Sequence, residues 1–162
     1  MSSESLTAAV LTVSDSATRG EREDQSGPAV ASALEARQFQ VTVREVVPDE
    51  RKKIEATLIR LSLQVRLIVT TGGTGIAPRD VTPEATEAVC ERLLPGVGEQ
   101  MRIVSREKTE FAALSRAVCG ARGTTLILNL PGSPKGAVES LEAVIDLVPH
   151  ALQLLGGDTE HR

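Results

Sequence analysis

The most informative stretch of the chain reads Leu67-Ile68-Val69-Thr70-Thr71-Gly72-Gly73-Thr74-Gly75-Ile76-Ala77-Pro78-Arg79-Asp80-Val81-Thr82-Pro83-Glu84. Its first residues are apolar and β-branched, which predicts a buried strand. A glycine-rich loop follows, and then a helix start, where Thr82 can cap the helix and Pro83 suits its first position. This order of elements is typical of an anion site at the carboxyl end of a parallel strand.

The glycine loop Gly72-Gly73-Thr74-Gly75 has two interpretations. Glycines are common in tight turns, where they supply a positive φ. A loop of small residues can also bring backbone N–H groups close to a phosphate. The pattern leaves both open, but it excludes two standard nucleotide motifs. The dinucleotide fingerprint G-x-G-x-x-G, begun at Gly73, meets Pro78 at its sixth position, and the P-loop pattern is absent.

The remaining chain alternates predicted strands with predicted helices, and 18–26 reads as a polar loop. We expect strands at 6–13, 40–47, 66–70, 118–122 and 124–129, and helices at 27–37, 50–63, 82–94, 98–108 and from 134 to a break at Pro149 before 151–155. The 40–47 segment alternates polar and apolar residues and suits an edge strand. This alternation predicts one α/β domain over residues 1–162, a three-layer α/β/α sandwich around a mostly parallel sheet.

Such a sheet makes a geometric prediction about the polar loops. The carboxyl ends of parallel strands lie along one edge, so the loops that begin at Ser14, Pro48, Thr71 and Leu130 should converge on one cleft. These are the loops richest in glycine, aspartate, serine and threonine. We therefore expect the functional site at this edge.

Asp49 and Asp80 are the candidate catalytic residues of these loops. Asp49 can instead be a helix cap after Pro48, and Asp80 a turn acid paired with Arg79, because aspartate is common at both kinds of position. Two carboxylates on neighbouring strand ends can also hold Mg²⁺, which prefers hard oxygen ligands and substrate phosphates.

A second candidate anion site lies at Pro131-Gly132-Ser133-Pro134-Lys135. A helix start there presents free N–H groups, and Lys135 adds a positive charge. The same residues also fit a plain serine cap with proline in the first turn. Ser14 and Asp15, on the first loop, are equally open to a turn role or a ligand role.

Composition restricts the classes of function. The 162 residues carry a net charge of −4 and only two aromatic residues, Phe39 and Phe111, which argues against a nucleic-acid surface. Cys90 and Cys119 lack metal-ligand spacing and suggest a reduced, cytoplasmic protein. No run is long enough to span a membrane, and 1–5 does not read as a signal peptide. We expect the last five residues to be disordered.

Five blocks of the chain resemble the MogA/MoaB family of molybdenum cofactor biosynthesis, which is related to the gephyrin G domain. The blocks stand in the order that the family shows and span nearly the whole chain. They are Thr12–Ser16 with Gly20, Asp24 and Ser26–Pro28; Val47–Glu50; Thr70–Thr86; Pro95–Arg102; and Leu128–Gly136.

The resemblance implies a molybdopterin adenylyltransferase, which converts ATP and molybdopterin to adenylyl-molybdopterin and pyrophosphate. It implies catalytic roles for Asp49 and Asp80, Mg²⁺ with the ATP, and assembly into trimers or hexamers. It also implies that the nucleotide and the pterin phosphate bind to Ser14, Asp15, Gly72, Gly73, Thr74, Gly75, Pro131, Gly132, Ser133 and Lys135. One alternative is a family member that binds molybdopterin or nucleotide without turnover. The failed fingerprint argues against a second, a Rossmann-type oxidoreductase.

Overall fold

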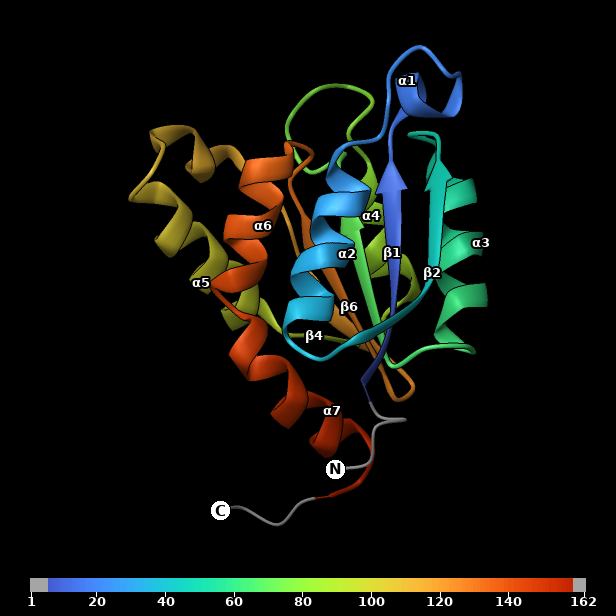
Figure 1. The fold of residues 1–162 in the computed structure, drawn as a ribbon, viewed down its shortest axis with the longest axis vertical. Helices are drawn as coiled ribbons and strands as arrows, with labels where there is room; N and C mark the ends of the chain where they lie inside the picture. The colour runs from blue at the N-terminus through green and yellow to red at the C-terminus, as the bar shows by residue number, and fades with distance from the viewer. Residues whose placement is uncertain (1–5, 159–162) are drawn as a thin grey trace.

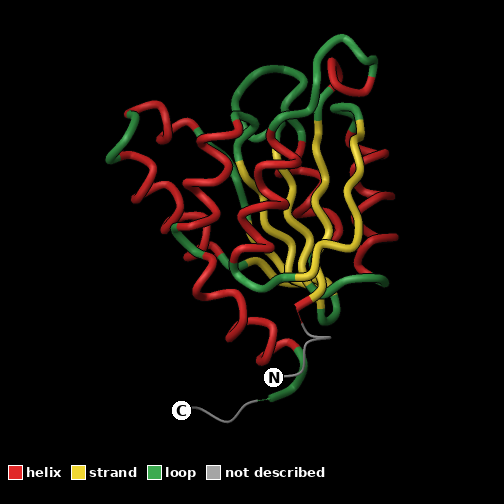
Figure 2. The backbone as a smooth tube through the Cα atoms, in the orientation of Figure 1, coloured by secondary structure: helices red, strands yellow, loops and turns green. Residues whose placement is uncertain are grey.

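A six-stranded sheet lies at the centre of the computed structural model, which describes residues 6–158 (Figures 1 and 2). Its strand order is β2-β1-β3-β6-β5-β4. The pairs β1–β2, β1–β3 and β3–β6 are parallel, whereas β5 runs antiparallel to both of its neighbours. The strands are β1 Thr7–Val13, β2 Gln40–Val47, β3 Leu67–Thr71, β4 Arg92–Leu93, β5 Cys119–Arg122 and β6 Thr125–Leu130. The mostly parallel sheet and the edge position of β2 are both confirmed.

The apolar runs of the central strands divide their side chains between the two faces of the sheet, as period-two alternation requires. In β1, Ala8 and Val10 enter one core cluster while Ala9 and Leu11 enter the other. The middle of β6 alternates in the same way. The sheet is therefore covered on both faces at its centre, which explains why the central strands read as continuous hydrophobic runs rather than as an alternating pattern.

Helices form the two outer layers (Figure 1). One layer contributes α2 Ser26–Ala36, α5 Pro95–Arg106, α6 Pro134–Glu142 and α7 Val148–Leu155 to the first core cluster. The other layer consists of α3 Arg51–Ser62 and α4 Thr82–Val89. The predicted three-layer α/β/α sandwich is confirmed. Short elements complete the chain, namely α1 Asp15–Thr18, η2 Glu110–Leu114 and η3 Ile145–Leu147.

The helix predicted over 82–94 begins at Thr82 as expected but is too long at its C-terminal end, and the helix predicted over 98–108 begins three residues too late. The helix ends at Val89 because Cys90 is extended, and Arg92 and Leu93 then pair antiparallel with β5 as β4. Helix α5 begins directly at Pro95, since proline lacks the N–H that would be unpaired in a first turn. Strand pairing with a distant segment overrides local helix propensity here.

The C-terminal helical region also breaks earlier than predicted. Helix α6 ends at Glu142, and Pro149 sits in the first turn of α7 rather than at the break. Residues 15–18 form the short helix α1 at the start of a region that we expected to be loop. The predictions for residues 1–5 and for 159–162 of the tail lie outside the described residues. No helix in the described part of the chain combines the length and the apolar character that a membrane crossing requires.

Two leucines at the end of α3 provide a matched test of the packing. Leu61 is fully buried, whereas Leu63 is 87% exposed. Leu61→Ala should lower the free energy of unfolding by about 2–5 kcal/mol, because it leaves a cavity in the core. Leu63→Ala should change it by less than about 0.5 kcal/mol. Urea unfolding of both variants checks this, and equal effects would contradict the packing.

Candidate functional site

The register of the parallel strands brings the polar loops to one level. Thr12 of β1 pairs with Thr71 of β3, and Thr71 pairs with Leu130 of β6. The loops that follow these three strands therefore leave the sheet side by side. The loop after β2 joins them, because Val47 of β2 pairs with Val13 of β1. The loops gather at the upper end of the sheet in Figure 1. The predicted convergence at the carboxyl ends of the strands is confirmed.

The glycine loop needs its first two glycines for conformation and for space. Gly72 and Gly73 have φ values of +105° and +71°, a region that disfavours side chains. A Cβ on Gly72 would lie 2.3 Å from the Val13 carbonyl oxygen, and one on Gly73 would lie 2.3 Å from Thr82 Oγ1. The backbone of this loop is thus packed directly against its neighbours at the strand ends.

Hydrogen bonds tie the loop to β6 and to α4. Gly72 N donates to the Leu130 carbonyl at 3.1 Å, and Thr71 Oγ1 donates to the Pro131 carbonyl at 2.7 Å. Thr82 Oγ1 donates to the Gly72 carbonyl at 2.9 Å. The predicted cap role of Thr82 is therefore wrong: Thr82 is already helical, and its hydroxyl holds the loop instead.

Asp15 and Asp49 cross-link two of the loops by a reciprocal pair of hydrogen bonds. Asp15 N donates to Asp49 Oδ2 and Asp49 N donates to Asp15 Oδ1, both at 2.9 Å. Arg79 belongs to residues 72–80, which we call the glycine-loop segment. It donates to both carboxylate oxygens of Asp15 at 2.9 Å. The two N–H groups of the Arg79 guanidinium form a fork that matches the two oxygens of a carboxylate, which makes the contact geometrically specific. Three loops are thus joined through Asp15.

The two acids of this cross-link differ in electrostatic character. The Arg79 guanidinium hydrogen-bonded to Asp15 lowers the pKa of that carboxyl. Burial raises the pKa of Asp49, and the nearby charges of Asp15 and Asp80 raise it further, against the hydrogen bond from Asp15 N. Arg79 therefore satisfies Asp15, while Asp49 retains an unfavourable negative charge that a cation would relieve.

Asp80 closes the far end of the glycine-loop segment. Its Oδ2 accepts from Ala77 N at 3.0 Å, and its own N donates to the Ala77 carbonyl at 2.9 Å. A Cβ on Gly75 would lie 2.9 Å from Asp80 Oδ2. Asp80 is a turn acid in this respect, but it is not paired with Arg79 as the alternative interpretation held, because Arg79 binds Asp15.

Two cavities of about 550 and 480 Å³ meet at the glycine loop. The larger, which we call the acidic cavity, is lined by four aspartates, Asp15, Asp24, Asp49 and Asp80, and by residues that include Ser14 and Gly72. The smaller, which we call the helical cavity, lies between the loop and helices α5 and α6. The cavities share Gly73, Asp80, Gly132 and Ser133.

Eleven of the twelve residues predicted for the site line these cavities. Thr74, Gly75 and Pro131 belong to the helical cavity, and the other eight border the acidic one. Lys135 lines neither: its side chain is 88% exposed and lies 4.0 Å from Glu139. Ser14 and Ser133 act as helix caps, accepting from Ala17 N and Gly136 N.

Several residues of the site were not predicted. The helical cavity includes Phe111, Ser105 and Ser140, which no motif marked. Arg116 donates to the carbonyls of Gly75 and Asp80 from more than 30 residues away in sequence. These residues lie outside the four loops at the strand ends, on which the sequence-based prediction of the site rested, so their place in the site depends on contacts between distant segments.

The acids of the acidic cavity suit a Mg²⁺ ion only if phosphate and water complete its coordination. Among residues 6–158, no group of three or more His, Cys, Asp or Glu residues could hold a metal ion. Asp49 and Asp80 each have one carboxylate oxygen that accepts no hydrogen bond within the described residues. Two carboxylates that leave room for substrate phosphates are the usual surroundings of Mg²⁺.

Comparison with known proteins places this site in a family. The family described as "Probable molybdopterin binding domain" matches residues 9–150. The chain belongs to this family. The resemblance deduced from the five sequence blocks is thus confirmed.

Relatives within the family cover nearly the full chain. A molybdopterin adenylyltransferase of Helicobacter pylori is 46% identical over 92% of this chain and 87% of its own. The molybdopterin adenylyltransferase of Escherichia coli is 43% identical over 91% of this chain and 84% of its own. The crystal structure of the molybdopterin biosynthesis enzyme MoaB from Thermus thermophilus superposes with a TM-score of 0.88 at 52% identity, covering 94% of this chain and 97% of that one.

Arg79→Gln tests the electrostatics of the loop cross-link. Removal of the guanidinium should raise the pKa of Asp15 toward its ordinary value of 3.8, because Arg79 is the main cause of the lowering. In the wild-type chain, the Asp15 contact stabilises the fold above that value and loses its contribution as the pH falls through the lowered pKa. NMR titration of the carboxyl carbons measures the shift.

Arg19→Gln is the matched control for this change. Arg19 binds Glu21 and has the smallest of the effects on Asp15. Its loss should move the pKa of Asp15 much less than the loss of Arg79. Similar shifts in the two variants would mean that the fork between Arg79 and Asp15 does not exist in solution.

Proposed function

We propose that this chain is a molybdopterin adenylyltransferase, which transfers the adenylyl group of ATP to the terminal phosphate of molybdopterin. The observation that carries the proposal is the 43–46% identity to enzymes of that name over more than nine-tenths of the chain. Two adjoining cavities that share the glycine loop support it, because the reaction brings two ligands together at one phosphorus atom.

In the proposed reaction, an oxygen of the molybdopterin phosphate attacks the α-phosphorus of ATP. A new P–O bond forms to that phosphorus, the bond to the β-phosphate oxygen breaks, and pyrophosphate leaves with the electron pair. Both reactants are anionic, so catalysis depends on holding them in line and on balancing charge. Mg²⁺ bound with ATP would supply positive charge at the phosphates.

The positions of the site residues suggest a separate role for each of them in this reaction. Gly73 lines both cavities and Gly75 lines the helical one, and neither carries a side chain of its own that would keep a phosphate from its backbone N–H group. Asp49 and Asp80 would hold the magnesium ion between the loop and the phosphates. Arg79, whose side chain is 62% exposed, can attract substrate phosphate while it orients Asp15.

A binding protein without turnover is the second candidate. It would use the same cavities and the same glycine loop. The two candidates differ in what Asp49 and Asp80 do, because a binding protein needs these acids only as turn and cross-link residues. Incubation of the purified chain with molybdopterin, ATP and Mg²⁺, followed by chromatography of the adenylylated product, separates the two functions.

Asp49→Asn and Asp80→Asn are the sharpest variants for this purpose. Each substitution removes the negative charge but keeps a side-chain oxygen, which can still accept the hydrogen bond from the backbone N–H that the aspartate accepts. Single-turnover adenylylation should fall by about 10²–10³, as for the loss of a preorganised electrostatic contact. The melting temperature should change little, since loss of such a turn contact costs about 1 kcal/mol or less.

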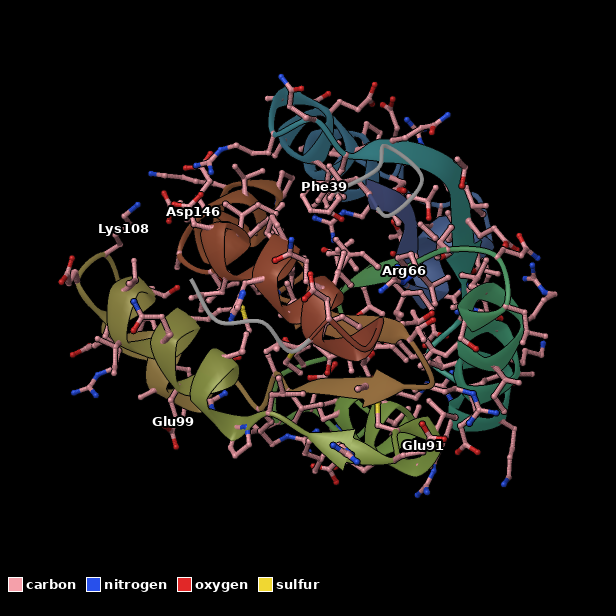
Figure 3. The ribbon with its side chains drawn as sticks, turned by 90° about the horizontal axis from the view of Figure 1, so that it is seen from below. Phe39, Arg66, Glu91, Glu99, Lys108 and Asp146 are labelled. Atoms are coloured by element: carbon pink, nitrogen blue, oxygen red, sulfur yellow. The ribbon has the colours of Figure 1, made fainter. Side chains whose placement is uncertain are left out.

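Asp146→Asn is the control for the loss of one negative charge. Asp146 lies on η3 (Figure 3), where its side chain is 85% exposed and pairs with Arg37, and it lines neither cavity. It should keep full turnover. If both site variants turned over as fast as this control, the acids would have no catalytic role and the binding-protein alternative would stand.

We also propose that the chain self-associates, most simply as a trimer. The family resemblance motivates this proposal, and exposed apolar residues on α5 and η2, such as Ile103 and Phe111, are compatible with it. Light scattering at micromolar concentration should give a mass about three times 17.2 kDa. A monomer mass would contradict it.

A further inference from the structure

Arg116 lies beneath the glycine-loop segment and makes four contacts there. Its Nε donates to the Gly75 carbonyl and its Nη2 to the Asp80 carbonyl, both at 2.8 Å. Its Nη1 binds the carboxylate of Glu84, and its backbone N donates to the Thr74 carbonyl at 2.8 Å. One residue thus holds the loop at both ends.

Two sets of side-chain contacts tie this loop to the rest of the domain: those of Arg116 and the fork between Arg79 and Asp15. Residues 75–80 project from the domain, and Ile76 at their tip is 68% exposed, so no apolar core anchors them. Within the segment, Ala77 and Asp80 bond to each other and close the far turn. The two carbonyls at its base, those of Gly75 and Asp80, meet at the same guanidinium.

Arg116 is itself held rigidly on its other sides. Glu84, in the first turn of α4, forms an ion pair with it. Arg102 of α5 donates to the Ala117 carbonyl at 2.9 Å and to that of Ser115 at 3.4 Å, so both peptide neighbours of Arg116 are fixed. The guanidinium therefore presents its donors from a supported frame, which a flexible surface arginine would not have.

We propose that Arg116 is a positioning residue of the transfer reaction: it sets the place of the Asp80 carboxylate and of the glycine-loop N–H groups toward the phosphates. This inference rests on the proposed function. Arg116 acts through the two carbonyls it binds and touches no reacting atom. A fork of several donors is essential to the role, because a single ammonium group cannot bridge both carbonyls and Glu84.

A purely structural role is the rival explanation, and Arg66 provides the control for it. Arg66 also donates to two backbone carbonyls, those of Thr124 at 2.9 Å and Leu152 at 2.7 Å. It lies at the opposite end of the sheet, which Figure 3 views from below. Loss of its donors should weaken the fold in a similar way without any effect on the site.

The experiment compares Arg116→Met, Arg116→Lys and Arg66→Met at a temperature well below all three melting points. Arg116→Met should lower kcat by about 10²-fold, the cost typical of a misplaced catalytic group, with a smaller change in KM for ATP. Arg116→Lys should behave like Arg116→Met, although it keeps the charge. Arg66→Met should keep the wild-type kcat.

Amide hydrogen exchange gives a readout that does not depend on activity. Exchange in residues 73–80 should rise by about tenfold or more in both Arg116 variants, because hydrogen bonds from a charged donor are lost there. It should be unchanged in Arg66→Met. An unchanged kcat in Arg116→Met, a full rescue by lysine, or unchanged exchange in 73–80 would each overturn the proposal.

The failure of the proposed function would look different. A wild-type chain that makes no adenylylated product would refute the proposed function, and with it the role of Arg116 in transfer. An active wild-type chain with an equally active Arg116→Met would refute the positioning role alone. The wild-type assay therefore separates the two.

Discussion

Parallel backbone pairing among β2, β1, β3 and β6 is the constraint on which the site depends. The strand ends are level because Thr12, Thr71 and Leu130 are register partners across three strands. A slip of one residue in any of these pairs would turn each side chain to the other face of the sheet, and both faces are buried. Core packing therefore fixes the register, and the register places four polar loops at one edge. The position of the cleft follows from hydrophobic burial that occurs well away from it.

Within the cleft, charged contacts take over from packing. Arg79 binds the glycine-loop segment to Asp15, and Arg116 binds the Gly75 and Asp80 carbonyls at its base and Glu84 of α4. Asp15 and Asp49 then connect the first two loops through their own backbone N–H groups. Burial raises the pKa of Asp49, while the Arg79 guanidinium holds the pKa of its neighbour Asp15 low. Two arginines thus hold the site in place: Arg79, which lies within the exposed loop, and Arg116, which binds the base of that loop.

Local sequence patterns predicted the parts of this structure that depend on local physics. Buried apolar runs identified β1, β3 and β6, and glycine with aspartate marked the converging loops, because both signals are contained in a few adjacent residues. The failures share a cause as well. Strand β4 exists only because Arg92 and Leu93 meet β5, and Arg116 matters only because its guanidinium reaches residues 75–84. Contacts between distant segments leave no periodic trace in the chain.

The two borders of the sheet show how the domain avoids adding further strands. An unpaired strand exposes a row of N–H and C=O groups that can recruit another chain. Strand β2 forms one border, and its outward residues include Thr42 and Arg44, which are poorly suited to a dry contact between sheets. Strand β4 forms the other border with only two residues before Pro95 starts a helix. One border is made polar and the other is cut short, so the same short β4 that local patterns did not predict also protects the chain from fibre-like stacking.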